Sequence, residues 1–412
     1  MSASNFFTLV FALFFLTSFK KPLAQILLIV LALGAVGCYL KYKPSLQLPR
    51  AHKWLVWVWV LMFASVLPNL FMDGSLEHFS YNLRLLNMPV IYLLGVLALV
   101  CLSHVPITLN QRVIFYSMAL ASACNGVIAL VGKLGFGIGR VSAWSTIVGF
   151  VTLSSIAIFG CYIYALYTPK RAERMFFSGA LLLGFMVVIM SATRSAWIAF
   201  ACTFIALSVL VLYLQKSYRS LPYMLILGAV LGGLFVGEQM LENRALIHIS
   251  RWAHESFSHD LKLYAQKNSD SSIGARLERW KEALVIVRLS PLFGMSLSAR
   301  CKHMDTIIAM AHSYHSVEGS DCKGKYDNEI FNTLAHKGLV GLGVLLALWG
   351  VVARIFWQRL QQNSQLPLLM LTMLFFYIVL GIGFDPFAYF IEGSFFVGMV
   401  VMGMVGTRPA PS

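Results

Sequence analysis

Long apolar runs dominate the chain and recur from one end of its 412 residues to the other. Each run has about 17–23 residues, long enough to cross roughly 30 Å of hydrocarbon as a helix. We distinguish twelve runs, at 3–19, 22–40, 53–71, 86–103, 112–132, 144–167, 175–192, 195–214, 222–240, 338–357, 366–384 and 388–406. Charged residues make up only 12% of the chain, against roughly 25% in a soluble domain. The sequence therefore predicts an all-α polytopic membrane protein with about twelve transmembrane helices.

Basic residues between the runs predict the orientation of the chain, because short cytoplasmic loops are enriched in Lys and Arg. With the N-terminus in the cytoplasm, the cytoplasmic side receives Lys41, Lys43, Arg50, Lys53, Arg112, Lys170, Arg171, Arg174, Lys216, Arg219, Arg354, Arg359 and Arg408. The opposite short loops receive only Lys20, Lys21, Arg84, Lys133, Arg140 and Arg194. We therefore expect both termini in the cytoplasm. No basic region precedes the first run and a second run follows at once, which predicts a retained span rather than a cleaved signal peptide.

This orientation divides the chain into three parts. Residues 1–240 are predicted to form the first nine spans, and residues 338–412 the last three spans with a short cytoplasmic tail. Residues 241–337 form a long extracytoplasmic loop domain, which holds eleven of the 17 acidic residues of the chain. The loop domain is the only large polar stretch, so we expect the catalytic residues there and at the adjoining span ends.

The loop domain itself contains helical patterns. Leu277, Trp280, Leu284 and Val287 recur at helical spacing within 275–289, which predicts an amphipathic helix lying on the outer surface. The Pro after Ser290 ends this helix. We also expect a helix over 301–312 and a loop over 316–325.

The cysteines and acidic residues show no pattern typical of a metal site. The chain has no CxxC, no Cys/His cluster at zinc spacing and no DxD, so we expect neither a metal nor another cofactor. Five cysteines lie in apolar runs and are interpreted as packing residues. Cys301 and Cys322 lie in the polar loop and form a disulfide if the loop faces an oxidising compartment, which the sequence leaves open. Although the net charge is +15, the basic residues are scattered among apolar runs, so we expect no nucleic-acid partner.

Three arginines are candidates for binding an anion at the outer face. Arg194 interrupts apolar sequence in SATRSAW, Arg140 ends the glycine-rich run GFGIGR, and Arg276 begins the predicted loop helix. Such arginines either reach lipid headgroup phosphates or clamp a pyrophosphate, whose oxygens match the guanidinium fork. GFGIGR lacks a preceding strand and a following Lys-Ser/Thr, so it does not predict a phosphate-binding P-loop. Arg279 and Arg288 are predicted to be solvated or to contact headgroups.

A polar segment, YDNEIFNTLAHKGLVGLG (326–343), leads from the loop domain into the tenth run. Asp327 or Asn328 can cap a helix there, and two glycines, Gly338 and Gly341, permit close helix approach. Asp327 is also a candidate general base or a group that orients the acceptor. The other candidate bases are His312 and His315. We expect both histidines to lie at the substrate-binding site, together with Arg140 and Asn328. Two isolated acidic residues, Asp385 and Glu392, are interpreted as structural, either as caps or as partners in an intramembrane pair.

Four segments together resemble the O-antigen ligase family of the bacterial inner membrane. They are TRSAW (193–197), SIGARLERW (272–280), SPLFG (290–294) and NEIFNTLAHKGLVGL (328–342), on a chain with a long loop between spans nine and ten. The resemblance implies a membrane-embedded, C-type glycosyltransferase-like fold with a large periplasmic loop. It implies a metal-independent transfer of polysaccharide from undecaprenyl pyrophosphate to a sugar hydroxyl of lipid A–core.

The resemblance also assigns roles to individual residues. The two key arginines of the family correspond to Arg194 and Arg276, and Arg140 stands where a further donor-binding arginine is expected. The family usually has His immediately before the Asn that opens the last motif, whereas here Asp327 precedes Asn328. Either Asp327 performs the task of that histidine, or one of the two loop histidines named above reaches in.

Three other functions compete with the ligase. O-antigen polymerases and protein O-oligosaccharyltransferases belong to the wider family and use the same donor. A transporter of lipid-linked sugars is a rival from another class, but it needs charges facing a central path at mid-membrane depth. Here the informative charges lie near the outer ends of the spans, which favours a transferase.

Overall fold

The computed structural model describes residues 2–20, 22–42, 48–71, 82–103, 105–138, 140–143, 145–191, 193–215, 258–314, 322, 324–360 and 365–407. These residues form helices and no strands. The main helices are α1 (Ala3–Phe14), α2 (Leu23–Tyr42), α3 (Arg50–Ala64), α6 (Val90–Leu102), α7 (Gln111–Leu130), α8 (Ile147–Tyr167), α9 (Arg171–Met190), α10 (Arg194–Gln215), α13 (Ser272–Leu289), α14 (Leu297–Lys302), α15 (Met304–Ala311), α16 (Glu329–Arg359), α17 (Gln365–Leu380) and α18 (Phe390–Gly406). Short helical turns are η1 (Phe15–Phe19), α4 (Pro68–Phe71), η2 (Leu83–Leu86), η3 (Val131–Gly135) and η6 (Pro386–Ala388).

The helices confirm a polytopic helical membrane protein. Within the described ranges, 8 helices are long and apolar enough to cross a membrane, and three shorter apolar helices accompany them. Together they coincide with the predicted runs except the ninth, 222–240, which lies outside the described residues. The number of twelve spans and the C-type glycosyltransferase-like fold therefore stay predictions.

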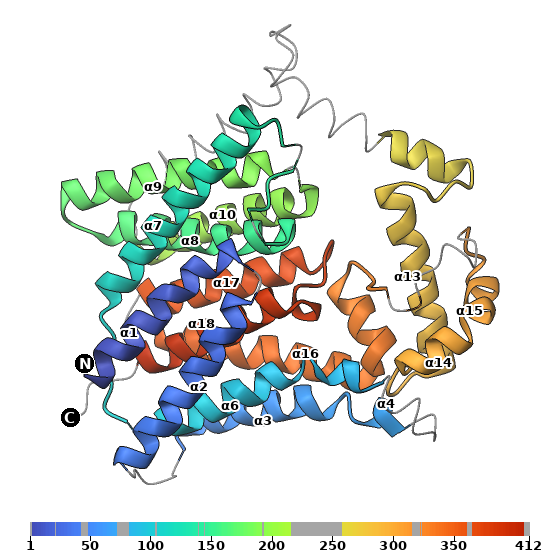
Figure 1. The fold of residues 1–412 in the computed structure, drawn as a ribbon, viewed down its shortest axis with the longest axis horizontal. Helices are drawn as coiled ribbons and strands as arrows, with labels where there is room; N and C mark the ends of the chain where they lie inside the picture. The colour runs from blue at the N-terminus through green and yellow to red at the C-terminus, as the bar shows by residue number, and fades with distance from the viewer. Residues whose placement is uncertain are drawn as a thin grey trace, which may run out of the picture.

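Three helices, α8, α17 and α18, form the interior of the bundle and are buried along most of their length. Figure 1 shows the other long helices arranged around them, with α8 contacting α7, α9 and α17. The outer helices leave large apolar side chains uncovered, including Leu33 at 65%, Trp57 at 63% and Ile198 at 62% exposure. In water such surface is unfavourable, but hydrocarbon solvates it, as expected for lipid-facing helices.

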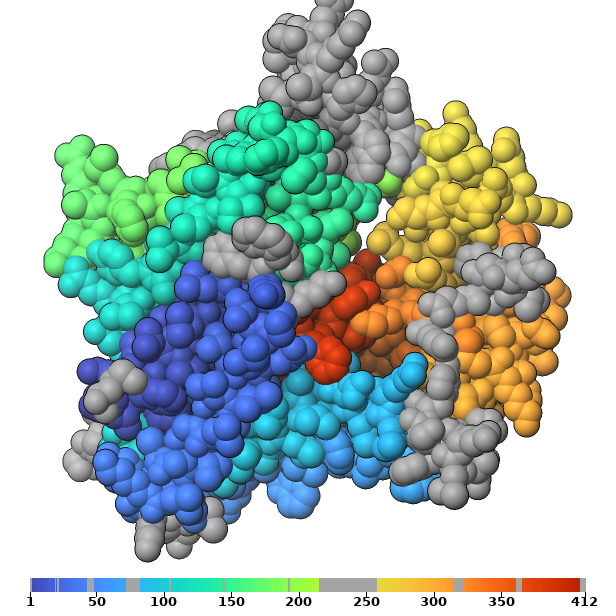
Figure 2. Space-filling model, viewed as in Figure 1, coloured from blue at the N-terminus to red at the C-terminus, as the bar shows by residue number. Residues whose placement is uncertain are grey.

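Three helices of the loop domain, α13, α14 and α15, lie together at one side of the bundle (Figures 1 and 2). Here α13 contacts both α15 and α16. A second, smaller hydrophobic core joins these elements, and its buried members are Ala283, Val285, Ile286, Ile307, Tyr326 and Ala335. This small core therefore fixes α13 against Tyr326 and the first turns of α16.

The predicted helix over 275–289 is confirmed as α13, but its predicted apolar stripe is not the buried face. Leu284 is 46% exposed, whereas Glu278 and Glu282 are buried together with Ala283 and Ile286. The reason is that hydrogen bonds from neighbouring segments compensate the buried carboxylates. Ser313 Oγ donates to Glu282 at 3.1 Å, for example. The stretch predicted as one helix over 301–312 is divided between α14 and α15.

Glu278 connects three parts of the loop domain, because its carboxylate accepts hydrogen bonds from each. The donors are Tyr264 Oη at 2.6 Å, Lys281 Nζ at 2.9 Å and the Tyr314 backbone N–H at 2.8 Å. Burial alone raises the pKa of this carboxyl, but the hydrogen bonds outweigh burial and hold the pKa below its usual value. The ionised form of Glu278 therefore stabilises the folded loop domain.

We expect a Glu278-dependent loss of stability in acid. Because the folded pKa is depressed, the contribution is fully present above the unfolded value of about 4.3 and is lost as the pH falls through the folded pKa. Thermal melting of the detergent-solubilised protein between pH 7 and pH 3 measures it. The melting temperature of the parent should fall further below pH 4.3 than that of Glu278→Gln. Equal pH profiles for the two proteins would contradict this role.

A sharp kink divides α16 at Gly338, whose φ of 61° and ψ of −159° are not helical. The segment after α13 fills this kink, because Leu339 N–H donates to Pro291 O at 2.8 Å and Val340 N–H donates to Leu292 O at 3.1 Å. A Cβ at position 338 would lie 2.4 Å from the Leu292 backbone, so only glycine fits. The predicted close approach at Gly338 is thus real, but the partner is a loop rather than a helix.

Candidate functional site

One face of α13 presents three side chains to the start of α16. Arg276, Arg279 and Trp280 stand at i, i+3 and i+4, a spacing that places side chains on one side of a helix. Trp280 Nε1 donates to Tyr326 O at 2.9 Å, and its ring stacks on Phe331 with centroids 5.4 Å apart. These contacts fix the two arginines of this face beside residue 327.

Asp327 pairs with both arginines of α13. Its Oδ2 accepts a hydrogen bond from Arg279 Nη1 at 2.6 Å and lies 3.9 Å from Arg276 Nε. The Asp327 side chain is 24% exposed and Arg276 31%, so the group is accessible from solvent. The backbone of Asp327 has φ of 49°, a left-handed conformation that few non-glycine residues adopt. The local fold thus holds one carboxylate between two guanidinium groups.

The residues after Asp327 fix this position. Asn328 is the N-cap of α16, since its Oδ1 accepts from Ile330 N–H at 2.9 Å and from Phe331 N–H at 3.1 Å. Its amide also donates to Ile382 O at 2.8 Å, and Glu329 N–H donates to Gly381 O at 2.8 Å. Of the two predicted caps, Asn328 is therefore the actual one. The substrate-binding role predicted for Asn328 stays a prediction beside this structural one.

Arg194 lies at the first residue of α10 and pairs with the loop domain. Its Nη2 is 3.6 Å from Asp260 Oδ2. Asp260 belongs to the helical stretch 258–265, whose Tyr264 donates to Glu278 of α13. Through these contacts Arg194 is connected to the helix that carries Arg276.

The other predicted site residues are not brought to Asp327 by a described contact. Arg140 is exposed in the segment 140–143 before α8. His312 is exposed at the end of α15, with φ of 47°, and the ion pairs of Asp327 come from α13 instead. His315 lies outside the described residues. The roles of these three residues stay predictions.

Two further expectations concern arginines and acidic residues. Arg279, expected to be solvated or bound to headgroups, is instead the closest partner of Asp327, and its i+3 spacing from Arg276 is the signal that would have indicated this. Asp385 stands directly before η6, but its side chain makes no capping hydrogen bond to that helix. The interpretation of Asp385 as a helix cap is therefore wrong. Glu392 lies in the first turn of α18 and is fully buried.

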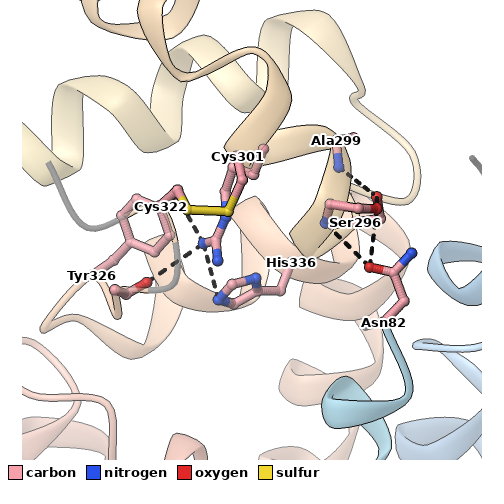
Figure 3. The surroundings of a disulfide bond; sticks show 10 residues. Asn82, Ser296, Ala299, Cys301, Cys322, Tyr326 and His336 are labelled. Carbon is pink, nitrogen blue, oxygen red and sulfur yellow. Dashed lines mark hydrogen bonds between the residues drawn. A yellow bond between two sulfur atoms is a disulfide. The ribbon is translucent and has the colours of Figure 1, made fainter. Parts of the chain in front are cut away.

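A disulfide between Cys301 of α14 and Cys322 answers the question that the sequence left open. Figure 3 shows it beside a guanidinium that lies between Tyr326 and His336. This is Arg300, whose Nη1 donates to Tyr326 Oη at 3.3 Å and lies 3.3 Å from His336 Nε2. Arg300 is only 1% exposed. The disulfide thus links α14 to the segment that carries Tyr326 and Asp327.

We expect removal of this disulfide to destabilise the loop domain. The bridge closes a loop with a sequence separation of 21, and the chain-entropy estimate for such a loop is about 3 kcal/mol. The double variant Cys301→Ser, Cys322→Ser should melt at lower temperature than the parent under oxidising conditions. Treatment with reductant should lower the melting temperature of the parent and leave that of the variant unchanged. A parent insensitive to reductant would contradict the assignment.

The fold and the site together define an integral helical membrane protein whose loop domain holds a carboxylate between arginines. A family model described as O-antigen ligase matches residues 179–346, which include Arg194, Arg276 and Asp327. This match confirms the resemblance to the O-antigen ligase family over these residues. The chain is also 22% identical over 292 residues to an uncharacterized protein of Haemophilus influenzae, with 69% of each chain covered. The family match supports a glycosyltransferase-like enzyme of ligase or polymerase type.

Proposed function

We propose that this protein is an O-antigen ligase that transfers a polysaccharide from undecaprenyl pyrophosphate to a sugar hydroxyl of lipid A–core. The family match supports a lipid-linked polysaccharide substrate in general. The particular donor and acceptor named here are our proposal and go beyond that match. The observation that carries the proposal is the pairing of Asp327 with Arg276 and Arg279, beside a segment that also contacts Arg194.

In the proposed reaction the acceptor oxygen attacks the anomeric carbon of the donor sugar. The new carbon–oxygen bond forms as the bond from that carbon to the pyrophosphate oxygen breaks, and undecaprenyl pyrophosphate leaves with the bonding electron pair. The arginines stabilise the charge that grows on the departing phosphate oxygen. Asp327 takes the proton of the acceptor hydroxyl or orients that hydroxyl. The phosphate ester supplies the driving force, so no nucleotide is required.

The arrangement of Asp327 supports an anion site at the arginines. A carboxylate already occupies the guanidinium forks of α13, and phosphate oxygens match the same forks bidentately. A donor pyrophosphate would approach these forks and share them with Asp327. Such an approach leaves the carboxylate next to the reacting anomeric carbon, where an acceptor hydroxyl must also lie.

The proposed location is the bacterial inner membrane, with both termini in the cytoplasm and the site in the periplasm. The positive residues of the short loops support this orientation. The disulfide between Cys301 and Cys322 also supports it, because disulfides persist in oxidising compartments such as the periplasm.

The test is transfer by purified protein from a lipid-pyrophosphate polysaccharide donor to purified lipid A–core, with EDTA present. A polysaccharide linked to core, formed at the same rate with and without EDTA, is the expected product. Elongation of one lipid-linked chain by another would show a polymerase instead, and modification of an added protein would show a protein O-oligosaccharyltransferase. Movement of donor across vesicles without a new glycosidic bond would contradict a transferase.

A further inference from the structure

A cavity of about 210 Å³ lies next to the Asp327 segment but is separate from the arginines of α13. Its lining includes residues of η2, α14, α16 and η6, and none of Arg194, Arg276, Arg279 and Asp327. Its charged lining residues are Arg84, Arg300, Lys325, Lys337 and Glu329. Within this lining, cationic side chains therefore outnumber carboxylates.

Glu329 offsets part of this positive charge, and both of its carboxylate oxygens already accept hydrogen bonds from neighbouring groups. One oxygen accepts from Phe387 N–H at 3.0 Å and the other from Thr333 Oγ1 at 3.3 Å. Lys325 donates to Ala388 O, lies 3.0 Å from the centroid of the Tyr389 ring and interacts with the buried carboxyl group of Asp385. An anion that enters the cavity would meet the cationic side chains of Arg300 and Lys337 in its lining.

Arg300 supplies the most specific indication of a ligand. It is 1% exposed and its Nη1 is engaged, but Nε and Nη2 are buried without a hydrogen-bond partner among the described residues. His336 Nδ1 on the same lining is also unpartnered there, as is Asn332 Oδ1, an acceptor that a hydroxyl group of the ligand would satisfy. Leaving buried polar groups unpaired is unfavourable, because they lose their hydrogen bonds to water without replacement. A phosphate oxygen in the cavity would accept the free Arg300 hydrogens in the planar geometry that suits guanidinium.

We propose that this cavity binds a phosphate group carried by the acceptor glycan; the assignment to the acceptor rests on the proposed transferase function. Lys325 and Tyr326 directly precede Asp327, and they contact the cavity and Arg300 respectively. A phosphate bound here holds the acceptor beside the carboxylate that orients its hydroxyl. A donor pyrophosphate engages the separate arginines of α13. The enzyme thus has two anion sites, one for each substrate.

The first experiment measures inorganic phosphate binding by calorimetry on the full-length protein in detergent. The Arg276→Ala background removes the donor clamp, and we expect phosphate binding to persist in it. Adding Lys337→Gln should weaken the remaining binding at least about tenfold, whereas Lys302→Gln, at an exposed position of α14, should not change it. If Lys337→Gln does not fold, Arg300→Lys, which keeps the charge but loses the fork, carries the same test. The proposal would be overturned if the Arg276→Ala protein bound no phosphate. It would also be overturned if neither Lys337→Gln nor Arg300→Lys changed the affinity for phosphate.

The second experiment compares transfer to an acceptor before and after phosphatase treatment. For the parent, dephosphorylation should raise the acceptor KM about tenfold with a smaller change in kcat. For Lys337→Gln the two acceptors should have equal KM, with the donor KM as in the parent. A raised donor KM in Lys337→Gln would overturn the acceptor assignment. If the parent transfers to neither acceptor, the proposed function fails, while phosphate binding still decides whether the cavity is an anion site.

Discussion

Replacing Arg276 by alanine is expected to lower the transfer rate by about 100- to 1000-fold, the usual effect of removing one preorganised donor to a developing anion. Arg276 Nε already lies 3.9 Å from a carboxylate, so its guanidinium is oriented toward an anion in the absence of donor. Its 31% exposed side chain leaves room for the donor to approach. The measurement is initial rate with lipid-pyrophosphate donor and purified acceptor at saturating concentrations.

Two further variants distinguish a fork from a simple charge. Arg276→Lys should be nearly as poor as Arg276→Ala, because an ammonium group cannot replace two parallel N–H donors. The control is Arg288→Ala, which also removes one positive charge from α13 but at an exposed position. This variant should catalyse transfer at the parent rate. Equal melting temperatures across the set exclude misfolding. Full activity in Arg276→Ala would refute the clamp.

The length and composition of the apolar runs were sufficient to predict the helical membrane fold. A span needs a long apolar segment and little else, so local sequence determines it. The kink in α16 could not be predicted in the same way. It depends on Gly338 meeting the Leu292 backbone, 46 positions earlier, and nothing in the local sequence shows that contact.

The candidate site was predictable to the extent that it depends on one helix. Arg276 stands out because it begins a helix in a polar loop, and Asp327 because it replaces an expected histidine. The partner Arg279 was missed, although its i+3 spacing places it on the same face of the helix as Arg276. The sequence does not show that this face meets residue 327, because only the tertiary fold brings the two together. The phosphate cavity was missed for the same reason, since Arg84, Arg300 and Lys337 come from three separate elements.

Asp327→Asn is expected to lower transfer by about 100-fold or more, within the range for loss of general-base catalysis. The amide keeps the shape of the side chain and tolerates the positive φ at this position, because Asn, like Asp, is enriched there. The change therefore removes the charge and the proton-accepting oxygen without straining the backbone. A rate near that of the parent would instead direct attention to His312 or His315.

The same backbone requirement makes Asp327→His the more informative variant. Histidine also tolerates a positive φ, and it is the residue that the resemblance leads us to expect at this position. An imidazole beside Arg276 and Arg279 is disfavoured from taking a second proton, so it stays neutral and able to accept one. We expect Asp327→His to recover at least about tenfold over Asp327→Asn, with a new acidic limb in the pH–rate profile at or below the ordinary histidine pKa of about 6.5. A recovered transfer rate together with the new acidic limb would show that the side chain at position 327 accepts the proton. An inactive histidine variant that melts like the parent would show that the carboxylate acts through its ion pairs with the arginines.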